Sequence, residues 1–88
     1  MNTKILIIED DLDILDTLTD LLEDANYNVI KAKNGEQALE QFQQQPDLIL
    51  CDIKLPDIDG FSLLHSKQKQ HNLVFVPFIF VSAKNQMQ

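Results

Sequence analysis

Apolar and polar residues follow two patterns along this chain, continuous apolar runs and helical stripes. Residues 5–8 and 48–51 are unbroken apolar runs, typical of strands buried on both faces of a parallel sheet. Residues 74–81 are rich in β-branched and aromatic side chains and predict another strand. Residues 29–32 have mixed polarity, which predicts a short strand at an edge of the sheet.

Helical patterns fill the intervals between these runs. Residues 12–25 carry leucines at helical spacing with acidic residues on the other face, and residues 36–44 predict a second helix that Pro46 ends. A third helix begins at Phe61, buries Phe61, Leu63 and Leu64, and ends near residue 72. The alternation of strands and helices predicts one α/β domain over residues 1–88, with right-handed crossovers.

Each predicted buried strand leads directly into polar residues. Glu9 and Asp10 follow the first strand, Asp52 follows the third, and Ser82 follows the fourth. In open α/β sheets the ligand crevice lies outside the carboxyl ends of the strands. If the first and third strands are neighbours, these side chains converge at one edge of the sheet.

Other polar residues have simpler interpretations. Asp11 and Asp13 stand at the start of the first helix. Carboxylates at this position can cap free N–H groups, and the helix dipole favours their negative charge. His65 and His71 have no cysteine or carboxylate at ligand spacing and are expected at the surface. Cys51, within an apolar strand, is expected to be a small buried hydrophobe.

Three carboxylates at one edge require positive charge. At ~4 Å and an effective dielectric near 20, each pair repels by about 4 kcal/mol. A site of oxygen ligands alone favours Mg²⁺, whereas zinc prefers histidine or cysteine. A carboxylate such as Asp52 beside Mg²⁺ can be a ligand, a general base or a nucleophile towards phosphorus, and the Ser82 hydroxyl favours the last because phosphoryl oxygens need donors.

Composition narrows the choice of partners. The 88 residues carry a net charge of −7, and their seven basic residues are scattered lysines, which disfavours direct binding to nucleic acid or to an anionic membrane. No apolar run approaches the length of a membrane span, and the first residues have no signal-peptide layout. With one cysteine, the chain is expected in the cytoplasm.

Over its whole length the chain resembles the receiver domains of two-component response regulators. Three segments in register carry the resemblance, residues 7–11 (IIEDD), residues 50–60 (LCDIKLPDIDG) and residues 77–83 (PFIFVSA). The resemblance implies a flavodoxin-like sheet with strand order 2-1-3-4. The sequence ends at Gln88, so strand 5 and the last helices of the family are expected to be missing.

The family also implies roles for individual residues. Asp52 would accept a phosphoryl group from a sensor histidine kinase, and Ser82 would be the switch hydroxyl. Glu9 and Asp10 would bind Mg²⁺ together with Asp52 and the backbone carbonyl of Lys54. Such a domain assists its own phosphorylation and dephosphorylation in a phosphorelay and is not a turnover enzyme.

The chain departs from the family pattern in its last third. The phosphate-pairing lysine of the fifth strand has no counterpart. Lys54 and Lys84 are near enough in sequence to be alternatives for that role, but both are expected to be solvated loop lysines. Without a fifth strand, the strand at residues 74–81 has an exposed apolar edge, which predicts self-association or a longer parent protein.

Three other readings are weighed against the signalling module. A magnesium phosphohydrolase commonly has a second aspartate two residues after its nucleophile, where this chain has Lys54. A receiver-shaped interaction module that is not phosphorylated stays open because the pairing lysine is absent. A flavodoxin-like nucleotide binder is excluded because no glycine-rich loop follows Ile8.

Overall fold

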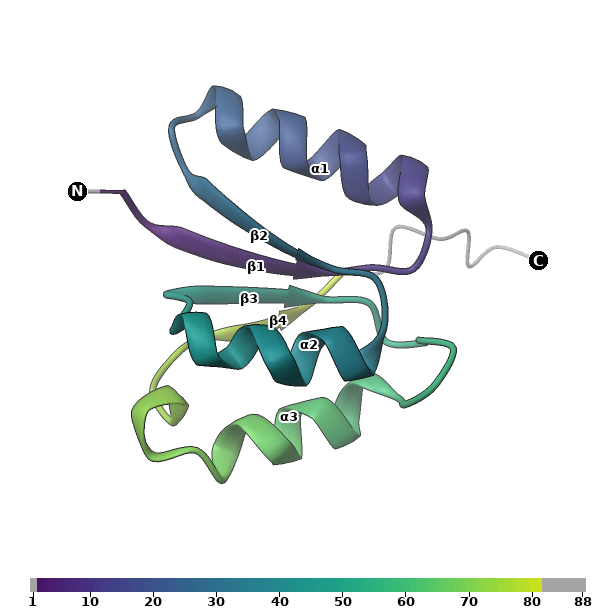
Figure 1. Cartoon of the computed structure of the whole chain (residues 1–88), viewed down its shortest axis with the longest axis vertical. Helices are drawn as coiled ribbons and strands as arrows, with labels where there is room; N and C mark the ends of the chain where they lie inside the picture. The colour runs from purple at the N-terminus through teal and green to yellow at the C-terminus, as the bar shows by residue number, and fades with distance from the viewer. Residues whose placement is uncertain (1, 82–88) are drawn as a thin grey trace.

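A parallel sheet with helices on both faces forms the body of the protein (Figure 1). The computed structural model describes residues 2–81. In chain order the elements are β1 (Lys4–Ile8), α1 (Leu12–Asp24), β2 (Asn28–Ala32), α2 (Gly35–Gln41), β3 (Leu48–Cys51), α3 (Gly60–Gln68) and β4 (Phe78–Phe80). Single 3₁₀ turns, Phe42–Gln44 and His71–Leu73, follow α2 and α3.

The sheet has the predicted strand order, β2-β1-β3-β4, and all of its pairings are parallel. In this register Ile8 lies beside Ala32 on β2 and beside Cys51 on β3. The first and third strands are therefore neighbours, and β2 is at an edge as its mixed polarity predicted. Figure 1 shows α1 over one face of the sheet and α2 and α3 over the other.

The core is most complete on the face covered by α2 and α3. Alternate residues of β1 and β3 point into it, and Phe42, after α2, is fully buried there. Its buried members are Leu6, Ile8, Ala32, Ala38, Phe42, Ile49, Cys51, Leu63 and Leu73. This packing fixes the two central strands side by side and so fixes where their carboxyl ends lie.

The face under α1 is less fully covered. Ile5, Ile7 and Leu15 are buried there, but Leu48 and Leu50 of β3 are only half-buried against them. The expectation that β3 is covered on both faces is therefore met on one face and only partly on the other.

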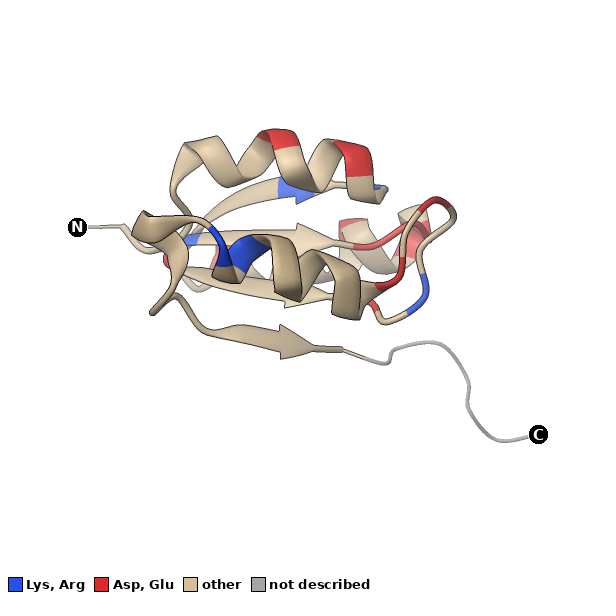
Figure 2. Cartoon of the chain, turned by 90° about the horizontal axis from the view of Figure 1, so that it is seen from below, with Lys and Arg blue, Asp and Glu red and all other residues tan. Residues whose placement is uncertain are grey.

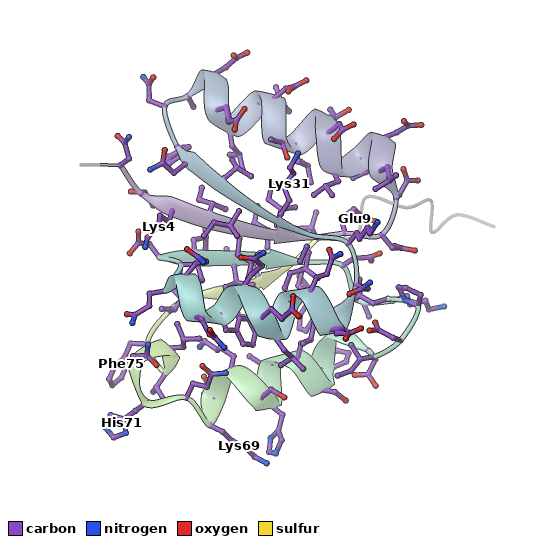
Figure 3. All side chains as sticks on the ribbon, in the orientation of Figure 1. Lys4, Glu9, Lys31, Lys69, His71 and Phe75 are labelled. Carbon is purple, nitrogen blue, oxygen red and sulfur yellow. The ribbon has the colours of Figure 1, made fainter. Side chains whose placement is uncertain are left out.

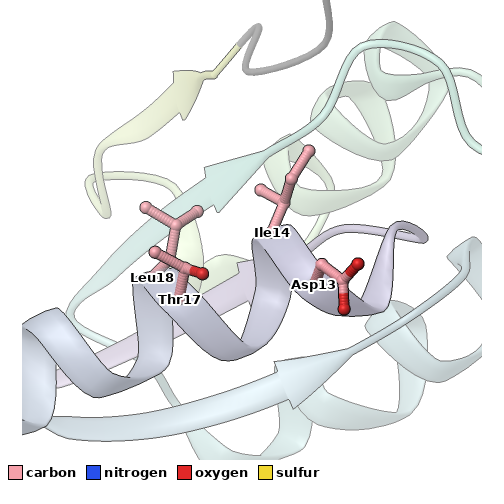
Figure 4. Close-up of a pocket in the computed structure, with 4 residues that line it drawn as sticks. All are labelled: Asp13, Ile14, Thr17 and Leu18. Carbon is pink, nitrogen blue, oxygen red and sulfur yellow. The ribbon is translucent and has the colours of Figure 1, made fainter.

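A pocket of about 300 Å³ opens beside α1 on this less covered face. It is lined by Asp13, Ile14, Thr17 and Leu18 (Figure 4). Leu18 also packs against the cluster formed by Ile5, Ile7 and Leu15. The described residues that line it all belong to α1.

The predicted helices form with some differences in their buried faces. Asp11 caps α1 as expected, since its side chain accepts hydrogen bonds from the N–H groups of Asp13 and Ile14. The prediction was wrong for Leu12 and Leu21, which are 56% and 60% exposed. The leucine stripe is wider than the part of the sheet that α1 contacts, so its outer members face solvent.

The prediction of a strand over residues 74–81 is wrong for its first half. Residues 73–76 form a turn in which the Val76 N–H donates to the Leu73 carbonyl, and β4 begins only after Pro77. Phe75, at 95% exposed, lies outside the sheet, as Figure 3 shows. The third helix likewise ends at Gln68 rather than near residue 72, and its predicted anchor Phe61 is 60% exposed and packs on the Phe80 ring.

Candidate functional site

Two backbone hydrogen bonds place the acidic residues at the carboxyl edge of the sheet. The Glu9 N–H donates to the Ala32 carbonyl at 2.9 Å, and the Asp52 N–H donates to the Ile8 carbonyl at 2.9 Å. These bonds extend the strand pairing by one residue beyond β1 and β3. The backbones of Glu9 and Asp52 are thereby held by the same kind of hydrogen bond that pairs the strands. Figure 3 shows Glu9 where β1 turns towards α1.

Three carboxylates meet at this edge. Glu9, Asp10 and Asp52 each offer an oxygen, and these oxygens all lie within 4.8 Å of one another. Glu9 and Asp52 are buried, at 2% and 5% exposed, whereas Asp10 is exposed. The cluster therefore has a buried floor of two carboxylates and a solvent-facing side formed by the third.

The two buried carboxylates are also oriented by nearby backbone N–H groups. The Asp11 N–H donates to Glu9 Oε2 at 2.9 Å. The Lys54 N–H donates to Asp52 Oδ1 at 3.4 Å, a long and weak bond. Such bonds hold the two carboxylates at this edge of the sheet.

The Cys51 thiol is affected by its burial and by the negative charges at this edge of the sheet. Burial of the thiol, with the charges of Asp52 and Glu9 nearby, raises the Cys51 pKa from 9.0 to about 12. The thiol is fully buried and donates to the Asp52 carbonyl at 3.1 Å. Cys51 thus stays protonated at neutral pH, and the prediction of a small buried hydrophobe is correct.

The donor set fits a hard divalent cation. Two oxygens bound to one Mg²⁺ at about 2.1 Å can be separated by at most about 4.2 Å. The 4.8 Å limit among the three carboxylates is close to this value, so small side-chain movements, or one intervening water, bring all three into range. An oxygen-only set suits Mg²⁺ better than zinc.

Acidic and basic residues are distributed differently over the described part of the chain. In Figure 2 acidic segments gather in the loops at the carboxyl ends of the strands, while lysines are spread over separate elements. His65 and His71 are both exposed, as predicted. Within residues 2–81 the acidic cluster is the group of side chains with the spacing for a metal ion.

Some predicted residues cannot be placed. Ser82, the expected switch hydroxyl, and Lys84, a candidate substitute for the phosphate-pairing lysine, lie outside the described residues. Lys54 is exposed, in line with a solvated loop lysine, and its backbone belongs to the loop that leaves Asp52.

Inspection of the sequence missed the tertiary role of Asp57. Its carboxylate accepts hydrogen bonds from the N–H groups of Gly35 and Glu36 at the start of α2. The second helix was predicted from residue 36, but Asn34 is the N-cap of α2 and Gly35 is its first residue. The available signal was a glycine at a helix start, which indicates a close approach by another segment.

The fold and the acidic edge define a class of protein. A parallel sheet of order 2-1-3-4, with carboxylates grouped after β1 and β3, is the architecture of receiver modules. The family model described as "Response regulator receiver domain" matches residues 5–88. The chain belongs to the response regulator receiver domain family, whose members are signalling domains of phosphorelays.

Individual relatives agree with this assignment. The chain is 38% identical over 85 residues to the uncharacterized transcriptional regulatory protein YrkP of Bacillus subtilis, covering 97% of this chain and 36% of that protein. It is 37% identical over 87 residues to the alkaline phosphatase synthesis transcriptional regulatory protein PhoP of the same organism, covering 98% and 35%. The chain thus spans about a third of the length of these relatives.

Solved structures share the fold over nearly all of the chain. The chemotaxis response regulator CheY4 of Vibrio cholerae superposes with a TM-score of 0.90 at 26% identity, covering 98% of this chain and 72% of that one. The HemR receiver domain of Leptospira biflexa gives a TM-score of 0.86 at 33% identity, covering 99% of this chain and 69% of that one.

Among residues 2–81, no helix combines the length and apolar character needed to cross a bilayer.

Proposed function

We propose that this chain is a phosphoacceptor module, in which Asp52 receives a phosphoryl group from a sensor histidine kinase. The observation that carries the proposal is the meeting of Asp52 with Glu9 and Asp10 at the carboxyl edge of the sheet. In the transfer, a carboxylate oxygen of Asp52 attacks phosphorus in line with the leaving imidazole nitrogen. The P–N bond breaks, the histidine nitrogen takes up a proton, and an aspartyl phosphate forms.

The residues around Asp52 have complementary roles in this proposal. Glu9 and Asp10 would hold Mg²⁺ together with Asp52 and the backbone carbonyl of Lys54. The bound ion would neutralise charge on a phosphoryl oxygen. Asp10 faces solvent, so the phosphodonor would approach from its side of the cluster.

The switch belongs to the same proposal. The N–H of Lys54, already directed to Asp52 Oδ1, is a backbone donor beside the reacting carboxylate. The Ser82 hydroxyl would bind a further phosphoryl oxygen and couple phosphorylation to a conformational change. Ser82 lies outside the described residues, so this role is a prediction, as is a cytoplasmic location.

An intact-mass measurement tests the proposal. The chain is incubated with Mg²⁺ and acetyl phosphate, and we expect a gain of one phosphoryl group that disappears in Asp52→Asn. Asp47→Asn is a matched control, because Asp47 is an exposed aspartate that bonds to Lys4 at the opposite end of the sheet. Absence of an adduct in the unmodified chain would favour an unphosphorylated interaction module, and steady phosphate release without an adduct would favour a hydrolase.

We also propose that the outer edge of β4 pairs with a second copy of the chain. Among the described strands β4 is paired on one side only, and its Ile79 is 49% exposed. Unpaired strand edges with apolar side chains promote association. A concentration-dependent increase in sedimentation coefficient is expected, and a monomer at all concentrations contradicts it.

The net charge of −7 disfavours direct binding of nucleic acid.

A further inference from the structure

Asp57 ties the loop after β3 to the start of α2. Its Oδ1 accepts the Gly35 N–H at 2.8 Å, and its Oδ2 accepts the Glu36 N–H at 3.0 Å. These partners are 22 and 21 positions away in sequence, so the contact is tertiary. The first N–H groups of a helix have no partner within the helix. Asp57 binds two of them, and the Asn34 side chain binds the next, at Gln37.

The junction is also closely packed. A Cβ atom on Gly35 would lie 1.8 Å from Ile58 Cγ2 and 3.1 Å from Asp57 Oδ1. Only glycine leaves room for the loop to approach the helix start at this distance. The hydrogen bond from Gly35 lowers the pKa of the Asp57 carboxyl, so the charged form that accepts both N–H groups is favoured.

The same loop carries Lys54, and its other contacts make it a closed unit. Lys54 forms an antiparallel bridge with Asp59, and the Gly60 N–H donates to the Ile53 carbonyl at 2.8 Å. Asp59 in turn caps α3 by accepting the Ser62 N–H at 2.8 Å. The loop is thus fixed to β3 at one end, to α3 at the other, and to α2 at its tip through Asp57.

We propose that Asp57 is a positioning residue of the metal site. By holding the tip of the loop against α2, it fixes the backbone around Lys54, whose carbonyl would be a further metal ligand in the proposed function. This inference rests on the proposed function, because it assumes that the site binds Mg²⁺. Groups that orient metal ligands from outside the coordination sphere change metal affinity by about 10–100-fold when removed.

Hydrogen exchange of the unmodified chain provides the first test. Coupling between two sites is reciprocal. If Asp57 transmits the loop position to the metal site, saturating Mg²⁺ slows exchange of the Gly35 and Glu36 amides by at least about 5-fold. The Asn28 N–H, which donates to Thr3 at the opposite end of the sheet, is the internal control and should not change.

Calorimetric titration of variants with Mg²⁺ provides the second test. Asp57→Ala should weaken Mg²⁺ binding by about 10-fold or more. Asp57→Asn should be intermediate, because its amide oxygen can accept one of the two N–H groups. Asp47→Ala removes the same charge and a hydrogen bond at the far end of the sheet, and it should bind as the unmodified chain does.

The outcomes separate this inference from the proposed function. If the unmodified chain takes up no Mg²⁺, the proposed metal site and the role of Asp57 are both wrong. If it binds Mg²⁺ and Asp57→Ala binds equally well, with faster exchange at Gly35 and Glu36, the metal site stands and the positioning role is overturned. Mg²⁺ binding that leaves both amides unaffected in the unmodified chain also overturns the positioning role.

Discussion

Replacing Gly35 by alanine tests the closeness of the junction between α2 and the loop after β3. In a helix this substitution ordinarily stabilises by about 0.5–1 kcal/mol, because alanine loses less conformational freedom on folding. Here the added Cβ would lie 1.8 Å from Ile58 Cγ2. Non-bonded carbon atoms normally come no closer than about 3.5–4.0 Å. The new Cβ and Ile58 Cγ2 would therefore have to move apart by roughly 2 Å.

The expected magnitude follows from the stiffness of the neighbours. Ile58 is β-branched, packs against the core, and follows Asp57, which two hydrogen bonds hold in place. Overpacking of this kind costs about 1–3 kcal/mol. After subtracting the propensity gain, Gly35→Ala should lower the free energy of unfolding by about 1 kcal/mol, within a range of about 0–2.5 kcal/mol. For a chain of this size, a loss of about 1 kcal/mol lowers the melting temperature by roughly 4–8 °C.

A double-mutant cycle isolates the contact. Ile58→Ala removes Cγ2, so in that background Gly35→Ala should show the propensity gain and stabilise by up to about 1 kcal/mol. The coupling energy should then equal the overpacking cost, about 1–3 kcal/mol. Urea unfolding followed by far-ultraviolet circular dichroism suits this chain, which has no tryptophan. Stabilisation by Gly35→Ala alone, or additivity of the two substitutions within about 0.3–0.5 kcal/mol, would refute the close contact.

Two further predictions concern the thiol beside the site and the cap of α3. Because the Cys51 pKa is raised to about 12, the folded chain keeps a proton that the unfolded chain releases above pH 9, so stability falls as pH rises from 9. This slope, at most about 1.4 kcal/mol per pH unit, should be absent in Cys51→Ala, and parallel curves for the two proteins contradict it. Asp59→Ala should cost about 1 kcal/mol by removing the acceptor for Ser62, whereas Asp59→Ser should retain most of the stability. Equal urea midpoints for both variants would argue against the cap.

The central sheet could be predicted because its pattern is local. The apolar runs of β1 and β3 end within one residue of Glu9 and Asp52, and a parallel sheet brings such ends together. The first residue of β4 could not be predicted in the same way. Its apolar pattern starts at residue 74, but Pro77 has no N–H to donate, and the turn before it uses the backbone of Val76 instead.

The partners of Asp57 could not be predicted from the sequence for a different reason. Its partners, Gly35 and Glu36, belong to another helix, and no periodic pattern links positions that far apart. The exposure of Leu12 and Leu21 is of the same kind, since periodicity defines an apolar stripe without defining how much of it the sheet covers. Local patterns therefore predicted the strands and their acidic ends, whereas contacts between distant segments required the structure.

The account depends on Glu9, Asp10 and Asp52 sharing one divalent cation. Titration calorimetry with Mg²⁺ tests this most directly, using Asp10→Asn because Asp10 is exposed and can be replaced with little effect on packing. Asp16→Asn, an exposed aspartate on α1, is the matched control. We expect one Mg²⁺ per chain, at least about 10-fold weaker binding in Asp10→Asn, and unchanged binding in Asp16→Asn. No uptake of Mg²⁺ by the unmodified chain, or equal affinity in Asp10→Asn, would contradict the account.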